Sequence, residues 1–191
     1  MPQPPATPDQ ARPIPVSFRP ATPADASEVA EFAHRCFQEA YQTVMEPELM
    51  TRVLRDQFAP AQQRAEIEHP SAAWVLAEID GVLAGYAYLR RGRIPAIGAP
   101  ADPVELARFY VDQSWHGRGV ARLLMDATVA RARALGGRTL WLAVWQRNPR
   151  AIAFYRKYGF TKAGACSWEQ TPGALEDDLM MLELGSDTGP A

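Results

Sequence analysis

The chain has little cysteine, little histidine and almost no net charge. Two of its 191 residues are Cys and three are His. Cys36 and Cys166 stand in no CxxC or CxxH spacing and are too few for a disulfide framework. The sequence therefore predicts neither a zinc ribbon nor a redox motif. We expect no metal site and a reducing, cytoplasmic location.

Positive and negative residues are nearly balanced, and no long apolar run occurs. Lys plus Arg number 20 against 22 for Asp plus Glu, a net charge of −2. A dedicated nucleic-acid binder is usually strongly basic, so we expect no nucleic-acid partner. A membrane span needs about 18 consecutive apolar residues, and none is present. Residues 1–15 lack the basic start and apolar stretch of a secretory signal, so no membrane association is expected.

What is present fits one domain of ordinary size. Apolar residues make up 47% and charged residues 22% of the chain, the balance of a globular protein. Six prolines crowd residues 1–15, which predicts a disordered tail. Residues 185–191 are expected to be a frayed end. A single domain over residues 16–184 follows.

Hydrophobic spacing alternates between the period of strands and the period of helices. Asp80-Gly81 predicts a tight hairpin, and Gly136-Gly137 and Gly159 predict helix ends. The predicted order is β-α-α-β-β-β-α-β-α-β-β, an α/β mixture of about seven strands and four helices. Strands are expected over 16–21, 72–79, 82–90, 104–111, 138–145, 161–168 and 178–184, and helices over 23–40, from 47 to an ill-defined end between 60 and 70, over 119–135 and over 149–158.

A glycine-rich turn, HGRGVA at 116–121, joins a predicted strand to a predicted helix. The first N–H groups of a helix have no partner within the helix, and the helix dipole favours negative charge there. Arg118 and Arg122 would add positive charge. The spacing fits neither GxxxxGK[ST] nor GxGxxG. Taken alone, the turn is either an anion site or merely a tight connection.

Residues 106–160 resemble the GNAT superfamily of acetyl-CoA-dependent N-acetyltransferases. The central signature of that family, Arg/Gln-x-x-Gly-x-Gly/Ala, matches His116, Gly119 and Ala121, with His in place of the usual Arg or Gln. A second signature, Asn followed by Ala-x-x-Phe-Tyr-x-x-x-Gly-Phe, matches Asn148, Ala151, Phe154, Tyr155, Gly159 and Phe160. The resemblance extends over residues 16–184 and implies a mixed, mostly antiparallel sheet flanked by helices.

The resemblance implies acetyl-CoA as co-substrate. The pyrophosphate would meet the amides of the glycine-rich turn, and the pantetheine arm would pair with the strand before it. The apolar residues of that strand, Leu106, Phe109 and Val111, stand at spacings of three and two. This favours a β-bulge over a regular strand. The implied cofactor-binding residues are Phe109, Tyr110, Val111, His116, Gly117, Arg118, Gly119, Val120, Ala121, Asn148, Ala151 and Tyr155.

The chemistry implied is direct attack of a primary amine on the thioester, without an acyl-enzyme. Tyr155 matches the general acid of the family, and its alternative role is packing beside Gly159. Glu105 is the candidate base, with Glu46 or water as alternatives. Asn148 before Pro149 is expected to contact the cofactor, to cap a helix, or to do both.

The finer resemblance is to the bacterial branch that includes polyamine N-acetyltransferases. It rests on residues 141–148, 164–168 and 178–180. Gln146 and Cys166 depart from the Glu and His common in that branch. We expect a small-molecule amine or a peptide as acceptor and, by resemblance, a homodimer. The alternative function is a non-catalytic acyl-CoA-binding or sensing module on the same fold.

Overall fold

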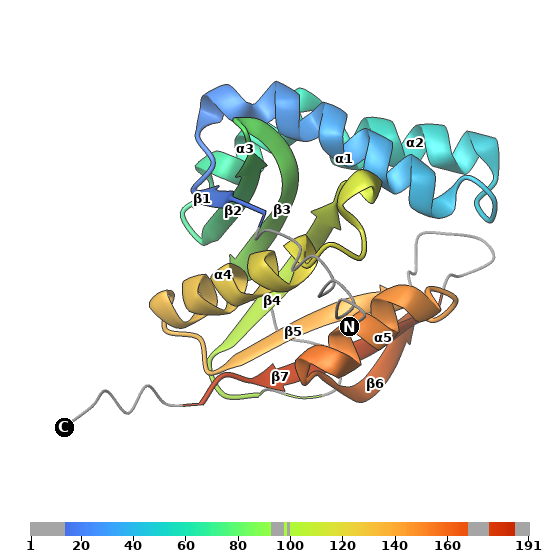
Figure 1. Ribbon diagram of the computed structural model, residues 1–191. Helices are drawn as coiled ribbons and strands as arrows, with labels where there is room; N and C mark the ends of the chain where they lie inside the picture. The colour runs from blue at the N-terminus through green and yellow to red at the C-terminus, as the bar shows by residue number, and fades with distance from the viewer. Residues whose placement is uncertain (1–13, 93–97, 99, 168–175, 186–191) are drawn as a thin grey trace, which may run out of the picture.

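The computed structural model describes residues 14–92, 98, 100–167 and 176–185 (Figure 1). The predicted tail at 1–15 and the predicted frayed end at 185–191 lie almost wholly outside these residues. No helix of the described part is long and apolar enough to cross a lipid bilayer.

The described residues form a seven-stranded sheet in the order β1-β2-β3-β4-β5-β7-β6 (Figure 1). The parallel pair is β4 with β5, and the other neighbours are antiparallel. This confirms the predicted mixed, mostly antiparallel sheet. The strands are β1 (Val16–Arg19), β2 (Ala72–Ile79), β3 (Val82–Arg91), β4 (Pro103–Val111), β5 (Thr139–Trp145), β6 (Thr161–Ser167) and β7 (Glu176–Glu183).

One predicted helix is two helices in the structure. The stretch that begins at Pro47 divides at Ala59, whose φ of −62° and ψ of 145° are extended. Pro60 explains the break, because its ring disfavours a helical residue before it and it has no N–H to donate. The helices are α1 (Ala26–Tyr41), α2 (Pro47–Phe58), α3 (Pro60–Glu68), α4 (Val120–Ala134) and α5 (Pro149–Tyr158), with short 3-10 turns at Pro23–Asp25 and Gln113–Trp115.

The turn signals of the sequence are confirmed. Asp80 and Gly81 both have positive φ, 53° and 77°, as the two-residue hairpin between β2 and β3 requires. Gly159 ends α5 with a φ of 119°. Its left-handed conformation suits glycine, which has no Cβ to clash.

The sheet carries a separate apolar core on each face. Helices α4 and α5 cover one face, where Leu124, Met125 and Ile152 pack against Leu106 and Leu142. On the other face, α1 and α2 contribute the larger part of the second core, which contains Val29, Phe32, Val53, Leu54, Phe58, Trp74, Tyr86 and Tyr88. We call these the α4/α5 face and the α1/α2 face.

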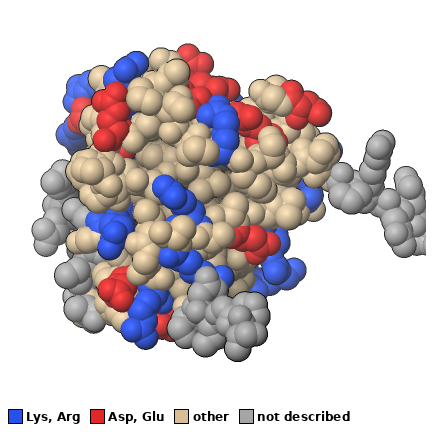
Figure 2. Space-filling model, turned by 90° about the vertical axis from the view of Figure 1, so that its left-hand side faces the viewer, with Lys and Arg blue, Asp and Glu red and all other residues tan. Residues whose placement is uncertain are grey.

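Two of the three arginines of α4 have partners nearby. Arg122 pairs with Asp126 at 3.4 Å, and Arg133 donates two hydrogen bonds to the carbonyl oxygen of Leu184. On the side of the molecule drawn in Figure 2, Lys and Arg lie among Asp and Glu. Such mixing is typical of a solvated surface.

Candidate active site

The site begins where two central strands separate. Strands β4 and β5 pair only between Pro103–Glu105 and Thr139–Trp141, at one end of both strands. Beyond Glu105 they diverge, as Figure 1 shows, and a cleft of about 1370 Å³ opens between them. The edge of β4 that faces this cleft has no neighbouring strand in the described part. Its backbone groups are therefore available to pair with a bound chain.

The bulge predicted in β4 is confirmed. Tyr88 of β3 is opposite Arg108, but the next residue, Leu89, is opposite Leu106, so Ala107 is the extra residue. The bulge changes which face each later side chain meets. Leu106, Phe109 and Val111 pack on the α4/α5 face, whereas Ala107 and Tyr110 pack on the α1/α2 face. Without the extra residue, Phe109 would point to the opposite face.

The glycine-rich turn places unpaired amides at the start of α4. Gly117 and Gly119 have φ of 75° and 88°, and a Cβ built on either meets no atom within 4 Å. The amide of His116 donates to Gln113 at 3.1 Å and that of Arg118 to Trp115 at 3.3 Å. Within the described part, no hydrogen bond is formed by the predicted phosphate-binding amides of Gly117, Gly119, Val120 and Ala121.

The His116 side chain has a role that the sequence did not indicate. Its Nε2 donates to the carbonyl oxygen of Val111 at 2.9 Å, so this ring nitrogen carries a hydrogen. The bond ties the turn to the end of β4. His116, Gly117 and Ala121 all line the cleft.

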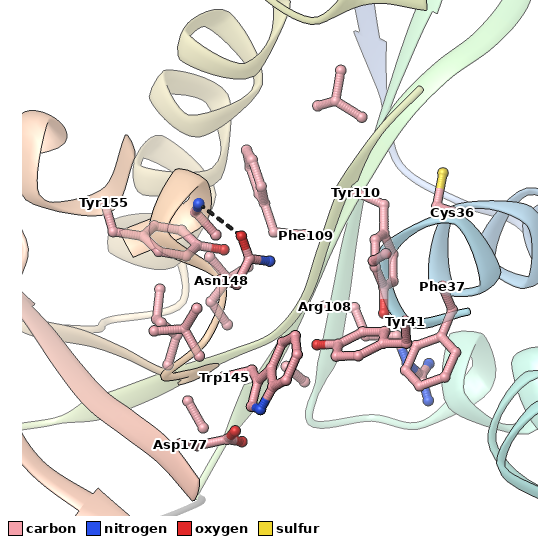
Figure 3. Close-up of a pocket in the computed structure, with 18 of the residues that line it drawn as sticks. Cys36, Phe37, Tyr41, Arg108, Phe109, Tyr110, Trp145, Asn148, Tyr155 and Asp177 are labelled. Carbon is pink, nitrogen blue, oxygen red and sulfur yellow. Dashed lines mark hydrogen bonds between the residues drawn. The ribbon is translucent and has the colours of Figure 1, made fainter. Parts of the chain in front are cut away.

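Tyr155 lies inside the cleft on the α4/α5 face. Its ring contacts those of Phe109, Phe154 and Phe160 with centroid separations of 5.5–6.3 Å. Its hydroxyl makes no hydrogen bond with the described residues and, in Figure 3, points toward Asn148. Burial raises the pKa of Tyr155 well above its usual range, so the phenol keeps its proton at neutral pH. Both predicted roles, packing and proton donation, are compatible with this position.

Asn148 caps α5, as its position before Pro149 predicts. Its Oδ1 accepts a hydrogen bond from the amide of Ala151 at 3.0 Å (Figure 3). Asn148 and Ala151 also line the cleft, where the Asn148 Nδ2 has no partner among the described residues. The cap is therefore confirmed, and the cofactor contact stays a prediction.

Of the two candidate bases, Glu105 lines the cleft and Glu46 does not. Glu105 is buried, and both of its carboxylate oxygens accept hydrogen bonds from Arg90, at 2.7 and 2.8 Å. It lines the cleft where β4 and β5 begin to separate. Glu46 is exposed at the start of α2 and is not among the residues that line the cleft.

The α1/α2 face of the cleft holds residues that the sequence did not single out. Arg108 is paired with Glu66 and also contacts the ring of Phe58 at 5.0 Å. The rings of Tyr41 and Trp145 lie 5.5 Å apart. No local pattern signals these contacts, because α1, α3, β4 and β5 are distant in the sequence.

Asp177 also lines the cleft and was not predicted from the sequence. Burial, with a smaller effect from the charge of Asp178, raises the pKa of its carboxyl to about 6. In the part of the chain that the structure describes, no cluster of three or more His, Cys, Asp or Glu is arranged to hold a metal ion.

Comparison with known proteins identifies the fold and the family. The model of the acetyltransferase (GNAT) family matches residues 27–160. An uncharacterized N-acetyltransferase of Mycobacterium tuberculosis is 32% identical over 160 residues, 84% of this chain and 98% of the relative. The N-alpha-acetyltransferase RimI of the same species is 31% identical over 151 residues, 78% of this chain and 81% of the relative.

A solved structure has the same fold. The PaiA N-acetyltransferase of Thermoplasma acidophilum, in complex with coenzyme A, superposes with a TM-score of 0.72 at 20% identity. The match covers 88% of this chain and 99% of that one. With its separated β4 and β5, its bulged β4 and both signature motifs in place, the chain belongs to the acetyltransferase (GNAT) family and is an acyltransferase.

Proposed function

We propose that the protein transfers the acetyl group of acetyl-CoA to a primary amine of a small molecule, with polyamines as the favoured class. One observation supports this most: the separation of β4 and β5 opens a cleft with two different walls. Tyr155 and the start of α4 lie on one wall. Carboxylates and aromatic rings lie on the other.

The first wall is suited to coenzyme A. A pyrophosphate at the start of α4 would meet the unpaired amides of Gly117, Gly119, Val120 and Ala121 and the positive end of the helix dipole. The pantetheine arm would pair with the open edge of β4 at Phe109, Tyr110 and Val111. The coenzyme A bound by the PaiA relative supports this assignment.

The reaction consists of one acyl transfer and two proton transfers. The amine nitrogen attacks the thioester carbonyl carbon, and the C–S bond breaks. In our proposal, the phenol of Tyr155 gives its proton to the departing thiolate. The amine loses one proton to a base and becomes the acetamide. The products are the N-acetylated amine and free coenzyme A.

Glu105 is our candidate for the proton acceptor, through a water molecule in the cleft. Both of its oxygens are already bound to Arg90, so a direct approach of the amine would have to displace that partner. Glu105→Gln tests this role. Loss of turnover with unchanged acetyl-CoA binding would support it, and full activity would leave solvent as the proton acceptor.

The second wall supports an amine as acceptor. Glu39, Glu66, Glu105 and Asp177 line the cleft together with six aromatic side chains of this face, which are Phe37, Tyr41, Phe58, Tyr88, Tyr110 and Trp145. Carboxylates and aromatic faces both attract ammonium groups. Glu66 and Glu105 are already paired with Arg108 and Arg90, so this support rests on the rings and on Glu39 and Asp177. The similarity to RimI gives a specific second candidate, the amino terminus of a peptide.

The test combines binding with turnover. Acetyl-CoA should raise the melting temperature of the protein and NAD should not, because only a ligand of the folded state stabilises it. Release of free thiol from acetyl-CoA should then depend on an added amine, in a panel of alkylamines, diamines and peptides. Acetyl-CoA binding without amine-dependent thiol release would instead favour the acyl-CoA-sensing module.

A further inference from the structure

The carboxylates of the cleft differ in whether they have a partner. Arg108 pairs with Glu66, and Arg90 pairs with Glu105. Glu39 accepts a hydrogen bond from the side-chain amide of Gln113 at 3.2 Å. Asp177 alone of these four forms neither a hydrogen bond nor an ion pair with any described residue.

Arg147 and Arg150 also line the cleft, but no ion pair joins Asp177 to either of them or to any other described residue. In the sheet, Asp177 is opposite Trp145 of β5 and Cys166 of β6, and these three side chains line the cleft. Tyr41 of α1 lies close to Asp177. Burial, with a smaller effect from the charge of Asp177, raises the pKa of the Tyr41 phenol to about 12. On its own strand the adjacent charges are Glu176, which is exposed, and Asp178, whose partner is Lys162.

Asp177 and Tyr155 belong to different faces of the sheet. Residues opposite each other on neighbouring strands share a face, so Asp177 lies with Trp145, whose ring meets Tyr41 of α1. Tyr155 packs in the α4/α5 core with Leu142 and Val144. In Figure 3, Asp177 and Trp145 lie below Asn148 and Tyr155. A group held at Asp177 is therefore separate from the nitrogen that reacts beside Tyr155.

We propose that Asp177, with the rings of Tyr41 and Trp145, binds a cationic group of the acceptor that is not itself acetylated. This deepens the proposed function and rests on it: the preferred acceptor would carry a positive charge in addition to its reacting amine. A carboxylate supplies the counter-ion, and the two rings supply faces that attract an ammonium group while excluding water. The cationic group of the acceptor would thereby form an ion pair with Asp177, which no described residue of the protein does.

The experiment compares acceptors that differ only in the second charge. Linear diamines from diaminopropane to diaminohexane are assayed beside the alkylamines of the same length, with the wild type and Asp177→Asn. We expect the wild type to prefer the best diamine over its matched alkylamine. We expect Asp177→Asn to lower kcat/KM for that diamine by on the order of ten- to a hundredfold, through KM, with little change for the alkylamine.

The matched control is Glu176→Gln, the same loss of charge at the exposed residue beside Asp177. It should leave the preference for diamines intact. Stabilisation of Asp177→Asn by acetyl-CoA, equal to that of the wild type, would show that the variant is folded and binds cofactor.

Two results would overturn the proposal while leaving the proposed function in place. One is equal use of diamines and alkylamines by both proteins. The other is a fall in kcat for both acceptors alike in Asp177→Asn, which would make Asp177 a base. If the wild type acetylates no amine at all, the proposed function itself fails.

Discussion

Replacing Tyr155 by Phe should separate activity from stability. The substitution removes one oxygen atom from a buried ring that contacts Phe109, Phe154 and Phe160. Because that hydroxyl makes no hydrogen bond with the described residues, the folded protein loses no internal bond there. The free energy of unfolding should therefore change by less than about 1 kcal/mol. If Tyr155 protonates the thiolate, kcat should fall by on the order of 10²–10⁴. That fall is about 3–5 kcal/mol in the activation barrier.

Tyr158→Phe is the matched control on the same helix. The hydroxyl of Tyr158 donates to Asp126 of α4 at 2.7 Å. Its removal should lower the free energy of unfolding by about 1 kcal/mol, a loss of roughly 2–4 °C in melting temperature. It should leave kcat unchanged, since Tyr158 does not line the cleft.

The assays are a denaturant or thermal melt and single-turnover thiol release from acetyl-CoA. The two variants should show opposite patterns. Tyr155→Phe should lose activity and keep its stability, whereas Tyr158→Phe should lose stability and keep its activity. If Tyr155→Phe kept the wild-type rate, Tyr155 would be a packing residue and the thiolate would take its proton from elsewhere. If Tyr155→Phe lowered both the stability and the rate, the loss of rate would be explained by disturbed packing and not by the loss of a proton donor.

Three further outcomes are expected. Gly119→Val puts a branched side chain at a φ of 88°, so it should cost about 1–2 kcal/mol of stability and weaken acetyl-CoA binding in a thermal-shift titration. Glu66→Gln leaves Arg108 buried without its counter-ion and should lower the free energy of unfolding by about 3 kcal/mol, whereas Glu68→Gln on the exposed side of α3 should cost less than about 0.5 kcal/mol. Below its pKa of about 6, Asp177 is protonated and uncharged, so the preference for diamines over alkylamines should fall as the pH drops through about 6. A preference that stays constant from pH 7 to 5 would contradict the last expectation.

The parts of the site that depend on local sequence were predictable. Hairpin, bulge and helix ends follow from Asp80-Gly81, from the spacing of Leu106 and Phe109, and from Gly159, because each is decided by a few adjacent residues. The break before α3 was harder to place. Pro60 alone does not determine whether a helix ends, kinks or resumes, and its apolar neighbours are sparse.

The second wall of the cleft, where we propose that the acceptor binds, was not predictable. It depends on the register of the strands and on contacts between residues that are distant in the sequence. Asp177 and Asp178 are adjacent acids in one strand. Only the pairing of that strand with β5 and β6 assigns Asp177 to the cleft and Asp178 to the pair with Lys162. The pair between Arg108 and Glu66 joins α3 to β4 across 42 residues. No local spacing indicates that Arg90 engages Glu105.

The central claim is direct acetyl transfer to an amine in this cleft, and a single-turnover experiment tests it most directly. Excess protein is mixed with isotope-labelled acetyl-CoA and the best acceptor of the amine panel, and both protein and small molecules are followed by mass spectrometry. We expect the labelled acetyl group to appear on the amine as coenzyme A is released, with the protein unlabelled throughout. Labelled protein that forms before the product, or acetyl-CoA that stays intact while bound, would contradict the account.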